Sequence, residues 1–479
     1  MLGDVSGDRP ATLGKLKASG WRSQPVVREI QRNAAERIAA GSQLVEGVIG
    51  FDGSVIPQLE NALLAGHDII FLGERGQAKS RIMRSLLALL DEWLPIVAGS
   101  EINDDPTRPV SKFARDLVAE AGDECPIEWV SREDRFTEKL ATPDTSMADV
   151  LGEIDPMKVA EGRYLSDELT VHYGLLPRAN RGIFAINELA DLAARVQVGL
   201  FNILEERDVQ IRGYKVRLPL DVVFLASANP EDYTNRGRII TPLKDRFGSE
   251  IRTHYPKDTR AELAVIAQET RPLRAAGVVV RTPEFMSEVI AEISQQARSH
   301  PHVNKRSGVS VRMSLANHEI LEANAMRRAL RCGESEAAPR VSDLAFLVAS
   351  MFGKIELDAF DDEAGERVFA EVVSKAVLKV FTRLCGDEQI LEVIEAFRDG
   401  TVVVVGDQVS SGDYTDILVR MPALERLAMS LAVADHENPA ALASAAELIL
   451  EGLHLTGKLS KSAVDGSSPE AGITYSGRC

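Results

Sequence analysis

The stretch from Gly73 to Ser80, G-E-R-G-Q-A-K-S, separates the apolar run 68–72 from a strongly helical run that begins at Arg81. A strand that leads into a glycine turn and then a helix presents backbone N–H groups and a positive helix end to a polyphosphate. Lys79 would then reach the β- and γ-phosphates, and Ser80 would bind Mg²⁺. The pattern predicts a phosphate-binding loop. Its candidate nucleotide-binding residues are Gly73, Gly76, Gln77, Ala78, Lys79 and Ser80.

One position departs from the usual motif. Ala78 stands where a second glycine normally precedes the lysine. A methyl group is tolerable there if the backbone keeps helical dihedrals, because alanine suits the first turn of a helix, whereas a required positive φ would forbid it. Taken alone, the loop could also be an ordinary strand-to-helix turn.

Composition narrows the classes of function. The chain has 479 residues, of which 45% are hydrophobic and 27% charged, enough for two or three domains with their own cores. A net charge of -17 disfavours nucleic acid or an anionic membrane as the main partner. No run is long enough to span a membrane, and the N-terminus does not resemble a signal peptide, so we expect a cytoplasmic protein with no membrane partner. The four cysteines form no C-x-x-C pair, which predicts reduced thiols.

Two further apolar runs end in polar residues. Residues 183–186 lead into Asn187 and Glu188, and residues 222–227 lead through Ala228 into Asn229. An apolar strand that ends in such a pair is where nucleotide hydrolases keep a metal-organising group and a water-polarising glutamate. Together with the loop, these strand ends predict a parallel α/β sheet whose ligand site lies at the carboxyl ends of its strands. The combination favours an ATPase.

At this point the sequence resembles the AAA+ ATPases, in the group that holds the magnesium chelatase ATPase subunit and the MoxR-type ATPases, over about residues 45 to 355. Residues 186–188, I-N-E, resemble the end of the Walker B strand, and Asn229 resembles the sensor 1 residue that aligns the attacking water. Residues 241–247, T-P-L-K-D-R-F, resemble a box whose arginine, here Arg246, is an arginine finger. Arg312, in S-V-R at 310–312, resembles sensor 2. Arg236 and Arg238 are rival fingers.

The resemblance also implies an architecture. The segments 150–178 and 209–218 are similar to two substrate-acting inserts of the group, the second of them a β-hairpin. An activator of the alternative sigma factor would carry a G-A-F-T-G-A loop, and the chain has no such string. We expect a P-loop AAA+ parallel sheet flanked by helices, followed by a helical lid and a helical C-terminal extension. The expected parts are a flexible tail at 1–24, a nucleotide-binding domain at 25–256, a lid at 257–355, a helical region at 356–456 and a disordered tail at 457–479.

Asn187 departs from the resemblance in a way that affects the metal. Its amide oxygen can accept a hydrogen bond from metal-bound water, but it brings no negative charge. We therefore expect ATP and Mg²⁺ as cofactors, Ser80 and Asn187 as metal-site residues, and weak ion retention with slow hydrolysis. Glu188, Asn229 and Arg246 are the expected catalytic residues.

The resemblance implies a ring, by analogy a hexamer, because an arginine finger past the third strand would complete the site of a neighbouring subunit. We expect the ring to remodel a protein partner, often one with a von Willebrand A domain. That partner would be a separate protein, because this chain has no D-x-S-x-S string. The alternatives are the ATPase subunit of a chelatase that inserts Mg²⁺ into a porphyrin, and a nucleotide-gated scaffold motivated by Asn187. A DNA motor would need Arg212, Lys215 and Arg217 at its contact surface, and the acidic balance argues against it.

Overall fold

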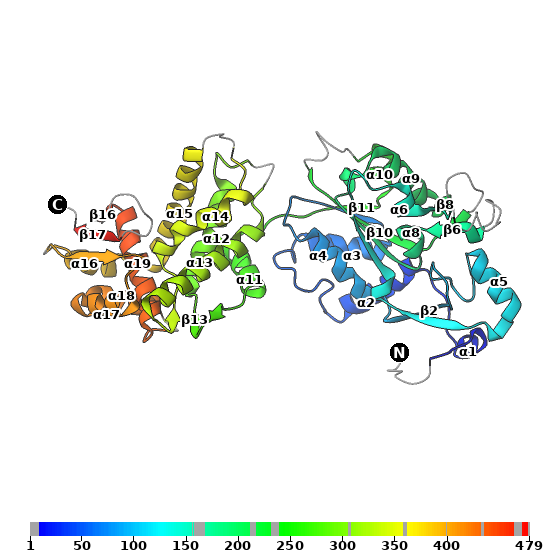
Figure 1. Ribbon diagram of the computed structural model, residues 1–479, viewed down its shortest axis with the longest axis horizontal. Helices are drawn as coiled ribbons and strands as arrows, with labels where there is room; N and C mark the ends of the chain where they lie inside the picture. The colour runs from blue at the N-terminus through cyan, green and yellow to red at the C-terminus, as the bar shows by residue number, and fades with distance from the viewer. Residues whose placement is uncertain are drawn as a thin grey trace. The chain divides into compact units, whose positions relative to one another are not determined.

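The structure is a computed structural model of the chain, and it describes residues 9–155, 157, 168–210, 217–230, 239–304, 308–357, 362–398, 400–432, 435–463 and 472–477. The chain divides into two compact units, residues 1–254 and 255–479, which we call the N-terminal unit and the C-terminal unit (Figure 1). The first ends close to the predicted end of the nucleotide-binding domain.

The N-terminal unit is built on a five-stranded parallel sheet with the strand order β11-β1-β10-β7-β4. Its strands are β1 (Ile69–Leu72), β4 (Phe136–Leu140), β7 (Gly182–Asn187), β10 (Val222–Ala228) and β11 (Ser249–Arg252). The three middle strands are buried along their whole length, as apolar runs covered on both faces should be. This confirms the predicted parallel sheet. The two edge strands were not predicted, because their sequences are short and more polar.

Successive side chains of each strand point to opposite faces of the sheet. In β1, Ile69 and Phe71 pack with the core formed by α2 (Val26–Ala39), α3 (Val55–Ala65) and α4 (Lys79–Ser85). Ile70 and Leu72 pack into the core on the other face, which includes α9 (Ala194–Glu206). Figure 1 shows α2, α3 and α4 on one side of the sheet and α9 and α10 on the other. The sheet is therefore the middle layer of three, and its carboxyl edge carries the phosphate-loop residues.

The remaining elements of this unit are short. The helices are α1 (Leu13–Ala18), α5 (Lys112–Ala121), α6 (Met147–Leu151), α8 (Leu175–Arg178) and α10 (Thr241–Arg246). The strands are β2 (Trp93–Val97), β3 (Ile127–Ser131), β5 (Gly152–Ile154), β6 (Val171–Tyr173), β8 (Asp208–Gln210) and β9 (Arg217–Pro219). They form the antiparallel pairs β2-β3, β5-β6 and β8-β9.

For both predicted inserts, the structure describes the antiparallel strands where the insert leaves and rejoins the domain. The β5-β6 pair joins the two ends of the segment 150–178, while residues 156 and 158–167 lie outside the described residues. The β8-β9 pair has the register expected of the hairpin at 209–218, and residues 211–216, with Arg212 and Lys215, lie outside the described residues. The helical run expected from Arg81 onward forms only the short helix α4. After α4 the chain continues as a 3₁₀ turn at Leu86–Leu89 and enters β2 at Trp93.

The structure corrects the predicted flexible tail at 1–24 for its described part. Helix α1 begins after Thr12, whose side chain accepts a hydrogen bond from Lys15 N. Leu13 and Leu16 are buried, and Leu13 packs in a small core that β2, β3 and α5 share. The i, i+3 spacing of these two leucines places both on one helix face, which is enough to anchor a short segment.

The C-terminal unit is mainly helical. Its helices are α11 (Thr259–Glu269), α12 (Glu284–Ser299), α13 (Val311–Cys332), α14 (Val348–Met351), α15 (Asp362–Leu384), α16 (Asp387–Glu395), α17 (Ser411–Arg420), α18 (Pro422–Leu431) and α19 (Pro439–Leu455). One hydrophobic core contains residues from α12, α13, α15 and α19, so the predicted lid and helical C-terminal region share a core.

Two small sheets correct the predictions for this unit. The sheet β12-β13-β14 interrupts the stretch predicted to be wholly helical, with strands Arg274–Ala275, Val278–Val280 and Glu336–Ala337. The sheet β15-β17-β16 lies in the stretches predicted to be helical or disordered, and its strands are Val402–Val405, Ile473–Gly477 and Leu459–Ala463. The last two strands lie in the predicted disordered tail. Buried Leu459 and Tyr475 hold them to the core, which the lysine- and serine-rich composition did not indicate.

Charged residues stand immediately before four strands of the large sheet. Arg135 precedes β4 and is fully buried, and its guanidinium donates two hydrogen bonds to Glu29 of α2, of 2.8 and 2.7 Å. Asp68 precedes β1, accepts from Phe224 N at 2.8 Å and pairs with Arg207. The other two are Arg181 before β7 and Asp221 before β10. This amino edge is therefore held by ion pairs and backbone hydrogen bonds within the unit.

Candidate functional site

The phosphate-loop stretch has a conformation that depends on glycine at two positions. A Cβ atom on Gly73 would lie 1.9 Å from Thr253 Oγ1 and 2.2 Å from Gln77 Oε1, so no side chain fits there. Gly76 has a φ of 77°, in the left-handed region that L-residues avoid. Buried Gln77 accepts hydrogen bonds from Glu74 N at 3.0 Å and from Thr253 Oγ1 at 2.8 Å. Thr253, which directly follows β11, thus braces the loop from the edge of the sheet.

Ala78 also lies in the left-handed region, with a φ of 57° and a ψ of 14°. From the sequence, an alanine is tolerable here only if the backbone keeps helical dihedrals, and Ala78 does not keep them. Such a conformation costs a non-glycine residue about 1–2 kcal/mol, because Cβ comes close to the following carbonyl oxygen. The loop keeps the turn of the glycine-containing motif, and the surrounding structure bears the strain.

Lys79 connects the loop to the end of β10. Its side chain is buried, and its Nζ donates to the carbonyl oxygens of Gly73 and Glu74, the latter at 2.9 Å. It also donates to Asn229 Oδ1 at 2.9 Å. An ammonium group beside this glycine turn is a charged hydrogen-bond donor, a kind of group that suits an anionic ligand.

Ser80 and Asn187 meet between the loop and β7. Ser80 Oγ donates to Asn187 Oδ1 at 2.7 Å, and Ser227 Oγ donates to the same oxygen at 3.2 Å. Two oxygen atoms therefore lie side by side where the sequence predicts a metal. Mg²⁺ prefers oxygen ligands, keeps several waters and needs only one or two protein groups, so this donor set fits it in kind.

Glu188 follows β7 in a strained conformation. Its φ of 54° and ψ of 50° are left-handed, and its N–H donates to Ser227 Oγ at 3.2 Å. Its carboxylate accepts a hydrogen bond from Asn229 Nδ2 at 2.7 Å. Non-glycine residues in this region cost about 1–3 kcal/mol and are concentrated at functional sites. The Glu188 side chain thus meets Asn229, which follows the neighbouring strand β10.

Sequence reasoning missed Glu138 and Arg84, which extend this cluster. Asn187 Nδ2 donates to Glu138 Oε1 on the neighbouring strand β4. Arg84 of α4 grips the same carboxylate, with Nε 2.6 Å from Oε2 and Nη2 3.1 Å from Oε1. Hydrogen bonding to Glu138, together with its negative charge, raises the pKa of Arg84. Apolar periodicity could not reveal Glu138, since β4 is a half-exposed edge strand.

The two predicted arginines belong to different units. Arg246 ends α10, where its Nη2 is 2.6 Å from Glu205 Oε1 and its guanidinium lies 5.4 Å from the centre of the Phe201 ring, both on α9. Arg312 is exposed in the first turn of α13, in the C-terminal unit. The rivals Arg236 and Arg238 lie outside the described residues. The structure thus brings the loop residues together with Asn187, Glu188 and Asn229, whereas Arg246 contacts α9.

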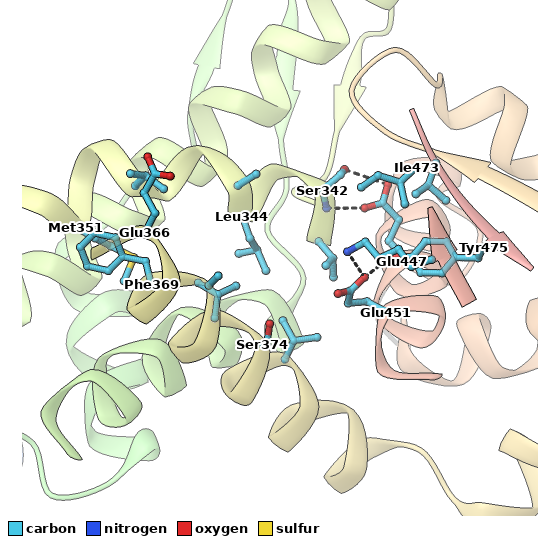
Figure 2. Close-up of a pocket in the computed structure, with 18 residues that line it drawn as sticks. Ser342, Leu344, Met351, Glu366, Phe369, Ser374, Glu447, Glu451, Ile473 and Tyr475 are labelled. Carbon is cyan, nitrogen blue, oxygen red and sulfur yellow. Dashed lines mark hydrogen bonds and ion pairs between the residues drawn. The ribbon is translucent and has the colours of Figure 1, made fainter. Parts of the chain in front are cut away.

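A cavity of about 280 Å³ lies in the C-terminal unit (Figure 2). Most of its lining residues are apolar, and its two buried glutamates are already engaged. Glu447 accepts from Ser342 N at 2.7 Å, and Glu451 Oε2 lies 2.7 Å from Lys461 Nζ. None of the predicted site residues lines this cavity.

Across the described part of both units, no helix has the length and apolar content that a membrane span requires.

Comparison with protein families gives one match, to the sigma-54 interaction domain, at residues 160–246. That range holds β7 and β10, with Asn187, Glu188 and Asn229, and also Arg246. The chain nevertheless lacks a G-A-F-T-G-A string.

Curated relatives point to magnesium chelatase. The magnesium-chelatase subunit ChlI of Anabaena variabilis is 30% identical over 212 residues, which cover 42% of this chain and 57% of that protein. The magnesium-chelatase 38 kDa subunit of Cereibacter sphaeroides is 28% identical over 212 residues, covering 42% of this chain and 55% of that protein. The chain thus spans about half the length of the curated relatives it matches.

Solved structures give weaker matches. NtrX from Brucella abortus in complex with ADP has 16% identity and a TM-score of 0.32, covering 62% of this chain and 55% of that chain. A chain from the complex between subunits BchI and BchD of magnesium chelatase has 18% identity and a TM-score of 0.34, covering 66% of this chain and 97% of that chain. The assignment of family rests on the sequence matches, the motifs and the sheet order. By these matches, the chain is related to AAA+ ATPases, namely to the magnesium-chelatase subunit ChlI and to the sigma-54 interaction domain.

Proposed function

We propose that the chain binds ATP with Mg²⁺ at the carboxyl edge of its large sheet and hydrolyses it. The observation that carries this proposal is one hydrogen-bonded cluster made from three strand ends. Lys79 and Ser80 come after β1, Asn187 is the last residue of β7 and Glu188 follows it, and Asn229 follows β10. Ligands of open parallel sheets bind at this edge, and the residue types match those of phosphoryl transfer.

Each residue then has a role that its contacts support. Lys79, which now donates to two loop carbonyls and to Asn229, would turn to the phosphate oxygens. Ser80 and Asn187 would hold the ion through their neighbouring oxygens. Glu188 would accept the proton of the attacking water, and Asn229 would orient the Glu188 carboxylate. When bound, MgATP supplies the phosphoanhydride bond and a cation that neutralises charge on the phosphates.

We also propose that the active form is a homo-oligomeric ring, a hexamer by resemblance. Arg246 supports a role between subunits, because its side chain is partly exposed and contacts α9 rather than its own phosphate loop. An arginine finger of this kind is worth about 10³- to 10⁵-fold in rate. Arg312, exposed at the start of α13, is the proposed sensor 2 residue.

The ring would remodel a protein partner, and a separate protein with a von Willebrand A domain is the partner class that the resemblance favours. The alternative is an ATPase subunit of a magnesium chelatase acting on a porphyrin. The 30% identity to the ChlI subunit favours this alternative over other AAA+ functions. A scaffold that binds nucleotide without hydrolysing it is the third reading, because Asn187 brings no charge to the ion.

Glu188→Gln tests the proposal. Removing the proton acceptor should lower ATP hydrolysis by about 10²- to 10⁴-fold while a fluorescent ATP analogue still binds. Lys79→Ala is the matched control, and it should lower nucleotide affinity itself, because it removes a charged hydrogen-bond donor. Proteins captured by the Glu188→Gln ring with ATP, and not without it, would identify the partner. If the wild-type chain binds ATP but hydrolyses it no faster than Lys79→Ala, the ATPase proposal fails and the nucleotide-binding scaffold remains.

A further inference from the structure

Asn187 and Glu138 lie on neighbouring parallel strands. In the register of β4 and β7, Glu138 pairs with Ala185 and Leu140 pairs with Asn187. Since residues two apart along a strand share a face, the side chains of Glu138 and Asn187 leave the sheet on the same side. The hydrogen bond from Asn187 Nδ2 to Glu138 Oε1 joins them. The amide at the predicted metal site therefore touches a carboxylate.

This contact fixes the orientation of the amide. An ionised carboxylate only accepts hydrogen bonds, so the NH₂ group of Asn187 must face Glu138. The amide oxygen must then face Ser80 and Ser227, whose hydroxyls donate to it at 2.7 and 3.2 Å. Glu138 thus aims the Asn187 oxygen at the hydroxyl with which it would share an ion.

We propose that Glu138 is a positioning residue that supplies, through Asn187, the negative charge that the amide lacks. The inference rests on the proposed function. An aspartate at 187 would bring a second carboxylate within hydrogen-bond distance of Glu138, and like charges so close raise the pKa of one of the two. Asn187 and Glu138 together therefore carry one negative charge. That charge lies on β4, one strand away from the metal-site position on β7. Weak ion retention, expected from Asn187 alone, does not follow for the pair.

Arg84 is the partner that could cancel this charge, and its exposure argues against full cancellation. Its side chain is 65% exposed, against 20% for Glu138. Water and salt screen an exposed cation more than a half-buried carboxylate. The two hydrogen bonds from Arg84 hold the Glu138 carboxylate in place. The hydrogen bond from Asn187 to Glu138 polarises the amide, which makes the Asn187 oxygen more negative.

The test measures ion affinity on the full chain. Mn²⁺, seen by electron paramagnetic resonance, replaces Mg²⁺ in the presence of a saturating non-hydrolysable ATP analogue. Glu138→Gln keeps the shape and removes the charge, so Mn²⁺ should bind about 10- to 100-fold more weakly, the usual cost of losing an outer-shell partner. Arg84→Gln removes a cation instead and should not weaken Mn²⁺ binding. If Glu138 were only structural, both variants would break the same pair and weaken binding alike.

An exchange of the two groups completes the test. The double variant Asn187→Asp/Glu138→Gln returns one charge to the pair and should recover most of the wild-type affinity. Failure of the double variant to exceed Glu138→Gln would overturn the proposal. Tryptophan fluorescence checks folding, because all three tryptophans, Trp21, Trp93 and Trp129, lie in the N-terminal unit.

Binding of the analogue in EDTA separates the two claims. A wild-type chain that binds the analogue without metal, while Glu138→Gln leaves Mn²⁺ affinity unchanged, would overturn the inference and keep the proposed nucleotide site. A wild-type chain that binds the analogue neither with nor without metal would overturn both.

Discussion

The two ends of the large parallel sheet use polar residues in different ways. At the amino edge, buried Arg135 and Asp68 meet opposite charges from the same unit, Glu29 and Arg207. At the carboxyl edge, buried Lys79 donates to two loop carbonyls and to Asn229, and the neighbouring backbone at Ala78 and Glu188 is left-handed. Opposite charges hold the amino edge, while the carboxyl edge combines strained backbone with a cluster of polar side chains that follow the strands. The comparison separates residues that stabilise the fold from residues that can bind.

The largest effect should come from breaking the amino edge. Glu29→Ala leaves the fully buried Arg135 without its carboxylate, and removing one partner of a buried pair costs about 3–5 kcal/mol. Urea unfolding followed by tryptophan fluorescence reports on this unit alone, because it holds every tryptophan of the chain. Glu36→Ala, an exposed glutamate on the same helix, is the matched control and should change little. Equal shifts for the two variants would contradict a structural role for the amino edge.

A smaller effect of opposite sign is expected at the carboxyl edge. Ala78→Gly relieves a left-handed alanine, and after the greater freedom of glycine in the unfolded chain is subtracted, stability should rise by about 0.5–1 kcal/mol. Ala35→Gly, at an exposed position inside α2, should instead lower stability by about 1 kcal/mol. The same urea experiment compares them. A loss of stability in both variants would show that Ala78 is not strained.

The smallest effect is a dependence on pH at the amino edge. Burial, the largest cause, raises the pKa of Asp68 above its ordinary value despite the opposing effect of Arg207. A carboxyl whose pKa is raised by folding binds its proton more tightly in the folded state. Its contribution is therefore fully present below the ordinary pKa and is lost as pH rises through the raised pKa.

Asp68→Asn should remove this term, so the fall in the urea midpoint with rising pH should be shallower than in the wild type. The slope is the readout, because the substitution also weakens the contact with Arg207 and shifts every midpoint. Parallel slopes would show that Asp68 does not titrate differently in the folded state.

The sequence predicts the buried part of the site better than its support. Apolar runs that end in polar residues located β1, β7 and β10, because parallel strands covered on both faces must be apolar. Glu138 escaped because β4 is a short edge strand of mixed polarity, without the pattern that marks a buried strand. The dihedrals of Ala78 escaped for another reason. Residue type sets the cost of a left-handed conformation, but the tertiary contacts of the loop decide whether it is adopted.

The two predicted tails show the same limit at the chain's ends. Helix α1 and strands β16 and β17 are each held by one or two buried apolar residues, among them Leu13, Leu459 and Tyr475. The average composition of such a segment is dominated by its lysines, serines and glycines, so the segment is predicted to be disordered. A few anchors are enough when the surface that receives them is already folded, and that surface is not visible in the local sequence.

The order of strands in the sheets has a consequence for synthesis. Strand β1 lies between β10 and β11, so the large sheet cannot close around its phosphate loop until residue 252 has been made. In the C-terminal unit, β17 is the middle strand between β15 and β16, and its residues 473–477 are among the last of the chain. Because chains grow from their N-terminus, each unit completes its sheet only when its own final strand emerges. The N-terminal unit can therefore finish folding while the C-terminal unit is still being translated.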